Sequence, residues 1–233
     1  TEAAWIGSSH LVARLRACPS SSASHAVLAH GAHAVTGGLG GLGLRSATML
    51  IDGGAPAVVL SSRGGAAAGV SIDAPKGAIV HLVACDVGDA REARSLLSRL
   101  PLTGVLHAAG VLNDKMLRSM SPAHVDAVFL PKALAASHVQ ASMPCTPLEA
   151  FGLFSSVAST FGGIGQANYA AANAHLDALS RCRRYHGTLV SSLQIPAVSG
   201  SGMGAATFDK EQHDAIGGIS LDEFAAFMSI SIH

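Results

Sequence analysis

The sequence AHAVTGGLGGLG, residues 32–43, joins a short apolar run to a glycine-rich loop and the beginning of a helix. Glycines at such a junction permit a tight turn and let backbone amides approach a pyrophosphate, whose charge the positive end of the helix stabilises. Gly38, Gly40 and Gly43 have the spacing of the dinucleotide fingerprint. We therefore expect the dinucleotide-binding loop to consist of Thr36, Gly37, Gly38, Leu39, Gly40, Gly41, Leu42 and Gly43.

Beyond this loop, short apolar strands alternate with helices, which is typical of an α/β doubly wound parallel sheet of the Rossmann type. We expect six strands, at residues 32–36, 57–61, 78–85, 104–108, 150–155 and 189–195. Helices are expected at residues 42–52, 90–100, 122–141, 169–186 and 221–230. Pro131 should bend the third of these helices near Lys132.

The length of 233 residues predicts one large domain, at residues 32–233, preceded by an extension at residues 1–31. The extension should be a helix or an extended leader followed by a linker, because Pro19-Ser20-Ser21-Ser22 interrupts it. The chain begins with Thr1 rather than Met, so we expect a piece cut from a longer polypeptide rather than a processed protein.

Composition argues against several classes of function. Charged residues make up 13% of the chain, with 15 basic and 15 acidic residues, so no basic field for nucleic acid is expected. No apolar run approaches the roughly 20 residues of a membrane span and no secretion signal opens the chain, which predicts a soluble, cytoplasmic protein. The four cysteines and twelve histidines show no metal-ligand or disulfide spacing, so no metal is expected.

A second group of residues has the types needed to protonate a carbonyl. Tyr169 follows Ser156 by thirteen residues and precedes Asn173 by four. A phenol has a pKa of about 10, so it needs a nearby cation and hydrogen bonds to serve as an acid near neutral pH. In ordinary short-chain dehydrogenases this cation is a lysine four residues after the tyrosine, the place that Asn173 holds here. Lys132, thirty-seven residues upstream, is the candidate replacement.

This exchange of lysine and asparagine resembles the ketoreductase domains of modular polyketide synthases and animal-type fatty acid synthases, within the short-chain dehydrogenase/reductase superfamily. Taken singly, Tyr169 could be a packing residue, Ser156 a turn hydroxyl, Asn173 a polar helix residue and Lys132 a solvated charge. Their joint occurrence after a nucleotide-binding loop favours the catalytic interpretation. By this resemblance the extension could be a remnant of the family's structural subdomain, and one more strand would follow residue 230.

The resemblance implies a reaction and its partners. NADPH would deliver hydride to the β-carbonyl of an acyl thioester on an acyl carrier protein, beside neighbouring synthase domains. Tyr169 would donate a proton to the developing alkoxide, and Ser156 would hydrogen-bond the same oxygen. Lys132 would lower the pKa of Tyr169, and Asn173 would hold the lysine's geometry.

The expected cofactor pocket extends over four strand ends. Thr36, Gly37, Gly41 and Gly43 also fit the tighter glycine pattern of short-chain dehydrogenases. No carboxylate follows the second strand, so Ser61, Ser62 and Arg63 favour the 2′-phosphate of NADPH over NADH. The resemblance adds the adenine contacts Asp86 and Val87, the small-residue passage His107, Ala108, Ala109 and Gly110, and Pro196 near the nicotinamide.

Two further stretches bear on stereochemistry and on the nicotinamide pocket. Asn113-Asp114 resembles the end of a Leu-Asp-Asp fingerprint with Asp114 retained, and Phe161 stands where the opposite stereochemical class has Trp, so a D-hydroxy, B-type product is expected. The stretch around Gln194 departs from a Trp-Gly-Pro-Trp-like pattern, which places doubt on the nicotinamide pocket. Residues 199–204, including Met203, should form a mobile lid.

Three functions remain open from the sequence. The leading one is an active NADPH-dependent β-ketoacyl reductase domain of a polyketide or fatty acid synthase. The second is a free-standing reductase of a small carbonyl compound, and the third is a reductase-inactive structural or epimerase-like module. Because all four catalytic positions are filled, we expect activity.

Overall fold

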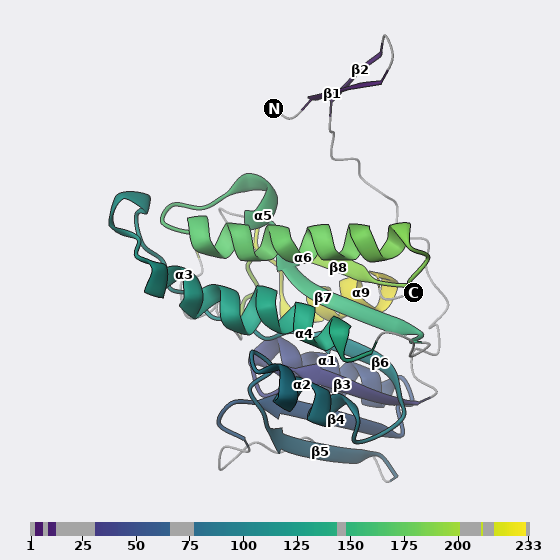
Figure 1. Ribbon diagram of the computed structural model, residues 1–233. Helices are drawn as coiled ribbons and strands as arrows, with labels where there is room; N and C mark the ends of the chain where they lie inside the picture. Colours follow the sequence, from purple (N-terminus) through teal and green to yellow (C-terminus); the bar gives the residue numbers. More distant parts are fainter. Residues whose placement is uncertain are drawn as a thin grey trace.

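A six-stranded parallel sheet forms the centre of the computed structural model (Figure 1), which describes residues 3–6, 9–12, 31–65, 77–143, 148–200, 211 and 217–231. Its order is β5-β4-β3-β6-β7-β8, and every neighbouring pair is parallel. The strands are β3 (Ala32–Thr36), β4 (Ala57–Ser62), β5 (Ile79–Ala84), β6 (Leu102–His107), β7 (Ala150–Ser156) and β8 (Ser191–Ile195). The predicted six strands and fold class are confirmed.

The chain leaves β3 towards one edge of the sheet and then crosses back to place β6 on the other side of β3. In doubly wound sheets, this reversal opens a crevice at the carboxyl ends of the two central strands, where ligands bind. The glycine loop follows β3 directly, so the topology places it at this crevice.

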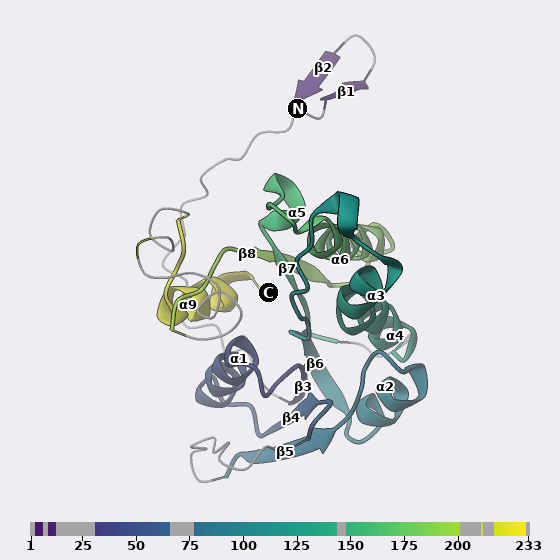
Figure 2. The same cartoon turned by 90° about the vertical axis from the view of Figure 1, so that its left-hand side faces the viewer.

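Helices cover both faces of the sheet (Figure 2). One face carries α1 (Gly41–Asp52) and α9 (Leu221–Ser231), and the other carries α2 (Ala90–Leu97), α3 (Pro122–Phe129), α4 (Ala135–Ala141) and α6 (Ala167–Tyr185). Two short elements that the sequence did not predict are the 3-10 turn η1 (Leu117–Ser119) and the helix α5 (Ala158–Phe161). Within the described residues no helix is both long and apolar enough to cross a membrane.

The helix expected at residues 122–141 is divided by a π-helical segment, η2 (Leu130–Leu134). Pro131 lies in this segment and has no backbone N–H to continue an α-helical ladder, while the amide of Ala135 donates to the carbonyl of Leu130 five residues earlier. The expected bend is therefore a widened turn, and Lys132 lies inside it.

The N-terminal extension was predicted as a helix or an extended leader. Its described residues form two short antiparallel strands, β1 (Ala3–Ile6) and β2 (Ser9–Val12), so the helical alternative is wrong for these residues.

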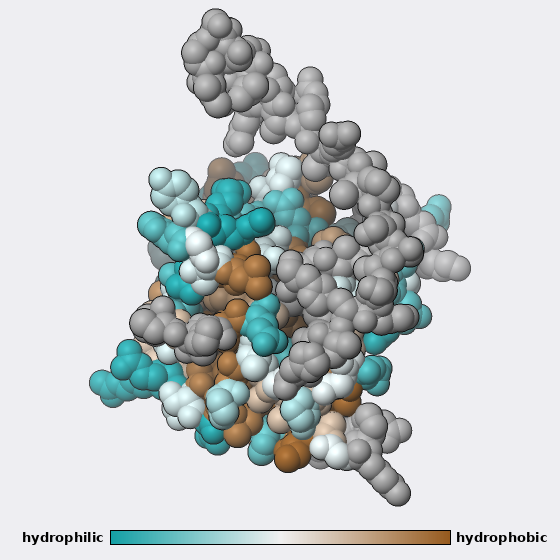
Figure 3. All heavy atoms as spheres, turned by 90° about the vertical axis from the view of Figure 1, so that its right-hand side faces the viewer, coloured by the Kyte–Doolittle hydropathy of each residue, from teal (hydrophilic) through white to brown (hydrophobic). Residues whose placement is uncertain are grey.

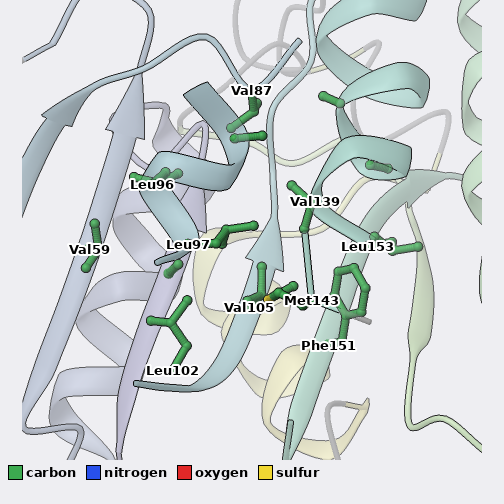
Figure 4. Close-up of a cluster of buried hydrophobic side chains, with 14 of the residues drawn as sticks. Val59, Val87, Leu96, Leu97, Leu102, Val105, Val139, Met143, Phe151 and Leu153 are labelled. Carbon is green, nitrogen blue, oxygen red and sulfur yellow. The ribbon is translucent and has the colours of Figure 1, made fainter. Parts of the chain in front are cut away.

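Buried apolar side chains form a core on each face of the sheet. One core joins α1 and α9 to the strands, and there Phe154 packs edge-on against Phe224 with ring centroids 5.7 Å apart. The other lies under α2, α4 and α6, where Val105, Phe151 and Leu153 of the strands meet Val139 of α4 (Figure 4). On the face seen in Figure 3, hydrophobic side chains reach the surface between hydrophilic ones.

Candidate functional site

The glycine loop packs against the end of β6 more closely than any residue with a side chain would allow. Gly37 has a φ of +69°, and a Cβ there would lie 2.6 Å from the backbone of Ala109. A Cβ on Gly43 would lie 2.5 Å from the carbonyl oxygen of Gly37. The loop therefore requires glycine at these positions for conformation and for close approach.

Helix α1 begins at Gly41 without a side-chain cap and without an acidic residue in its first turn. Its leading amides and positive dipole end are thus available to an anion. This helix end therefore fits a dinucleotide pyrophosphate.

A pocket of about 250 Å³ lies against this loop. Twelve residues expected at the cofactor line it: Gly37, Gly40, Gly41, Leu42, Gly43, Ser62, Arg63, Asp86, Val87, Ala108, Ala109 and Gly110. The lining is completed by three residues that were not predicted, Cys85, Val111 and Pro131. Cys85 and Val111 directly adjoin predicted residues, and this adjacency could have identified them from the sequence.

Six residues expected at the cofactor lie outside the lining of this pocket. Thr36, Ser61 and His107 are buried, Gly38 turns under the loop, and Leu39 packs against the core. Pro196 is half-buried after β8. The side chains of Thr36, Ser61 and His107 are buried inside the protein, so these three residues do not line the pocket.

The His107 imidazole connects the glycine loop to the π-helical turn. Its Nε2 lies 2.9 Å from the backbone carbonyl of Lys132, and its Nδ1 lies 2.6 Å from the hydroxyl of Thr36. Since a carbonyl can only accept, Nε2 carries the proton and Nδ1 accepts from Thr36. Burial lowers the pKa of His107 to about 4, which keeps the ring neutral.

The predicted catalytic residues lie together although they come from three separate elements. The Nζ of Lys132 lies 5.5 Å from the centre of the Tyr169 ring and donates to the carbonyl of Phe154 at 2.8 Å. Asn173 donates from Nδ2 to the Tyr169 carbonyl at 2.8 Å, and its Oδ1 is buried with no partner among the described residues. Ser156, at the end of β7, is within hydrogen-bonding reach of the phenol.

Lys132 is only 3% exposed. Burial lowers the pKa of its ammonium to about 8, and the negative charge of Asp177 opposes that decrease. The lysine is therefore a buried cation and not a solvated surface charge.

The pKa of Tyr169 lies above its ordinary value, so the expected lowering by Lys132 is not the dominant effect on this phenol. Burial raises the pKa of Tyr169, the side chains of Ser156 and Asn173 oppose this by hydrogen bonding, and the charge of Asp114 adds to it. The ammonium of Lys132 faces the ring and bonds to Phe154, so it does not bond to the phenol oxygen. Desolvation of the phenolate consequently outweighs its stabilisation.

Two of the residues expected to govern stereochemistry, Asp114 and Phe161, lie in the described part of the chain. Asp114 accepts a hydrogen bond from Nε2 of Gln166 at 2.9 Å, which ties its loop to the start of α6. Phe161 is 67% exposed at the end of α5. Met203 and most of the expected lid at 199–204 lie outside the described residues.

Gln194, where the sequence departs from the family pattern, does not line the glycine-loop pocket and forms hydrogen bonds within the protein. Its amide donates to the Asp177 carboxylate at 2.8 Å and to the Ser159 hydroxyl at 2.9 Å, and accepts from Thr160 at 2.9 Å. Asp177 and Ser159 were not among the predicted site residues. Asp177 follows Asn173 by one helical turn, so helical spacing from Tyr169 was the signal that could have found it.

Comparison with known proteins agrees with this geometry. The KR domain family model matches residues 31–200. The spectinabilin polyketide synthase system protein NorB of Streptomyces orinoci is 39% identical over 214 residues, covering 85% of this chain and 10% of that protein. Polyketide synthase GfsB of Streptomyces halstedii is 43% identical over 175 residues, covering 71% of this chain and 3% of that protein.

Solved ketoreductases share the fold. An A1-type ketoreductase has a TM-score of 0.78 and 33% identity, covering 94% of this chain and 50% of that one. The ketoreductase from the first module of phoslactomycin biosynthesis in Streptomyces sp. HK803 has a TM-score of 0.75 and 30% identity, covering 86% of this chain and 49% of that one. The chain belongs to the ketoreductase domain family of polyketide synthases, which are oxidoreductases with a short-chain dehydrogenase/reductase fold. It spans a tenth or less of NorB and GfsB.

Proposed function

We propose that this domain uses NADPH to reduce the β-keto group of an acyl thioester carried on an acyl carrier protein, as part of a larger cytoplasmic synthase. The observation that carries the proposal is the buried ammonium of Lys132 at 5.5 Å from the ring of Tyr169, beside a glycine-lined pocket. Family membership supports the reaction type. The arrangement of Ser156, Tyr169, Lys132 and Asn173 favours an active reductase over an inactive module.

In this mechanism NADPH, when bound, supplies the hydride. Tyr169 is protonated at neutral pH, because burial raises its pKa, and can therefore donate its proton to the developing alkoxide. The Ser156 hydroxyl donates a hydrogen bond to the same oxygen, where charge appears only in the transition state. The Lys132 ammonium then stabilises the phenolate that remains, and Asn173 fixes the helix turn that carries Tyr169.

The reaction is tested with a β-ketoacyl N-acetylcysteamine thioester by following NADPH oxidation. We expect Tyr169→Phe to lose at least about 100-fold in kcat, because general acid catalysis contributes that much or more. Tyr185→Phe is the matched control, since Tyr185 is 89% exposed and is the only other tyrosine. Unchanged turnover in Tyr169→Phe would reject the assignment, and faster reduction of a simple cyclic ketone than of the thioester would favour a free-standing carbonyl reductase.

Arg63 is proposed to select NADPH. It follows β4 and lines the pocket, and its guanidinium can pair with the 2′-phosphate, assisted by the Ser62 hydroxyl. We expect Arg63→Ala to raise the KM for NADPH by about 10-fold or more and to leave that for NADH unchanged, as a charge-assisted bond contributes about 1.5–3 kcal/mol. Arg91→Ala, on exposed α2, is the control. Equal effects on both cofactors would contradict this selection.

A D-hydroxy product is proposed from the retained Asp114 and from Phe161 in place of Trp. Asp114 is fixed beside the start of α6 by Gln166, close to the helix that carries Tyr169. Chiral analysis of the reduced thioester tests this, and an L-hydroxy product would overturn it. We further propose that residues 32–233 form the catalytic unit and residues 1–31 an extension of it.

A further inference from the structure

Asp177 is a buried carboxylate that the mechanism above does not use. It lies on α6, one helical turn beyond Asn173 and two beyond Tyr169, and is 7% exposed. Its Oδ1 accepts from the Ser192 hydroxyl at 2.5 Å, and its Oδ2 accepts from the Ser159 hydroxyl at 2.7 Å and from Gln194 at 2.8 Å. Donors from α5 and β8 therefore converge on one carboxylate of α6.

The carboxylate is ionised at neutral pH. Burial raises the pKa of Asp177, but hydrogen bonds from the side chains of Ser159, Ser192, Gln194 and Ser155 together outweigh burial and lower it. Among the described residues, the one ion pair within contact distance joins Arg45 to Asp222. The side chains that contact the Asp177 carboxylate are therefore neutral donors. The hydrogen bonds from these side chains therefore stabilise the charged form of Asp177 inside the fold.

The end of β7 places this anion near the buried Lys132 ammonium. Lys132 donates to the carbonyl of Phe154, and the next residue, Ser155, contacts Asp177 and donates to the carbonyl of Asn173 at 3.3 Å. Asp177 is the charge that opposes the effect of burial on Lys132.

The other titratable groups facing Lys132 carry no negative charge at neutral pH. The His107 imidazole is neutral and bonds to the Lys132 carbonyl from β6. The phenol of Tyr169, from α6, is protonated, and Asp114 acts on that phenol rather than on the lysine.

We propose that Asp177 is a positioning residue for the reduction, whose carboxylate keeps the Lys132 ammonium charged and holds Ser159 and Gln194 against the turn that follows Ser156. Ser159 supports the second part, because its hydroxyl also lies 2.9 Å from the carbonyl of Ser156. This inference rests on the proposed function for its consequence in catalysis. Its electrostatic part can be measured without turnover.

The direct test is an NMR titration of the full chain with ¹³C-labelled lysines. The chain has four lysines, and Lys132→Met assigns the buried one. In Asp177→Asn, which keeps the shape and removes the charge, we expect the pKa of Lys132 to fall by about one unit, a tenfold lower ratio of ammonium to amine at fixed pH. Ser180→Ala is the matched control, because Ser180 is buried on the same helix and donates to the Val190 carbonyl at 3.1 Å.

An unchanged Lys132 pKa in Asp177→Asn, or an equal change in Ser180→Ala, would overturn the proposal. If Asp177→Asn does not fold, Asp177→Ser also removes the charge and offers a hydroxyl to the same donors, and it must lower the pKa of Lys132; no fall would count equally against the idea. These outcomes hold even if the wild-type chain fails to reduce the thioester, so failure of the proposed function remains distinguishable.

Catalysis gives the second readout. In Asp177→Asn we expect kcat to fall about fivefold at pH 8, where the pKa of Lys132 lies in the wild type, and the basic limb of the pH–rate profile to move about one unit lower, while the KM for NADPH is unchanged. Asp177→Glu, which restores the charge, should return the basic limb towards its wild-type position. A uniform loss of rate at all pH values, without rescue by Asp177→Glu, would show a merely structural role.

Discussion

Replacing Lys132 with methionine should stabilise the domain while abolishing its activity. Methionine keeps an unbranched apolar stem in the buried π-helical turn and removes the charge. The pKa of Lys132 lies at about 8, against 10.5 for the free side chain. A difference of about 2.5 pKa units corresponds to about 3 kcal/mol of unfavourable burial of the ammonium at neutral pH.

Part of this gain is lost again. The Phe154 carbonyl, which Lys132 reaches at 2.8 Å, would lose its buried donor, a cost of about 1–3 kcal/mol. We therefore expect a net increase of up to about 2 kcal/mol in the free energy of unfolding at pH 7. The result would be a trade of stability for function of the kind seen at other catalytic sites.

The stability difference between the wild type and the methionine variant should depend on pH in one direction. The folded-state pKa of Lys132 is depressed, so the wild type carries the full burial cost below pH 8 and sheds it as the pH rises from about 8 to 10.5. The advantage of the methionine variant should accordingly disappear over that range. Urea unfolding of both proteins at pH 7 and pH 10 measures it. A variant that is less stable at pH 7, or one whose advantage is the same at both pH values, would refute the argument.

Three other changes test the remaining structure. Burial lowers the folded-state pKa of His107 to about 4. The free energy of unfolding should therefore be unaffected by this group above pH 6.5 and should fall by up to about 3 kcal/mol as the pH decreases towards 4. In His107→Gln, the free energy of unfolding measured by acid unfolding should change less over that range. Gly43→Ala places a Cβ 2.5 Å from a backbone oxygen, so it should lower the free energy of unfolding by about 1–3 kcal/mol and weaken the binding of NADPH measured by fluorescence. Gly64→Ala is the control and should change neither quantity, because a Cβ there has nothing within 4 Å. Phe224→Ala removes a fully buried ring that packs on Phe154 and should lower the unfolding free energy by about 3–5 kcal/mol, and a loss below about 1 kcal/mol in a thermal or urea melt would contradict the packing described.

Periodicity predicted the regular elements well because each buries a continuous apolar stripe or strand. The six strands and their helices were located to within a few residues, as for the helix expected at 169–186 and found as α6 (Ala167–Tyr185). The π-helical turn at Pro131 could not be predicted, since the choice between a kink and a widened turn depends on what the freed carbonyls meet. Here the carbonyl of Lys132 meets the imidazole of His107, a residue distant in sequence.

The candidate site was predictable in membership and less so in its electrostatics. The spacing of Ser156, Tyr169 and Asn173 fixes three residues, and the family pattern supplies Lys132. The sign of the pKa change at Tyr169 depends on the balance between burial and hydrogen bonding, which the spacing does not contain. The hydrogen bonds of Asp177 could not be predicted from the sequence either, because its partners come from α5 and β8 rather than from its own helix.

The bare beginning of α1 has a consequence for how the domain responds to ligand. With no serine, threonine or acidic side chain at its start, the first turn has no internal acceptor for its leading amides. A bound pyrophosphate would accept hydrogen bonds from these amides, so binding of the dinucleotide and ordering of the first turn of α1 would be thermodynamically linked. Amide hydrogens at the start of α1 should then exchange with solvent quickly in the free protein and slow markedly once dinucleotide is added.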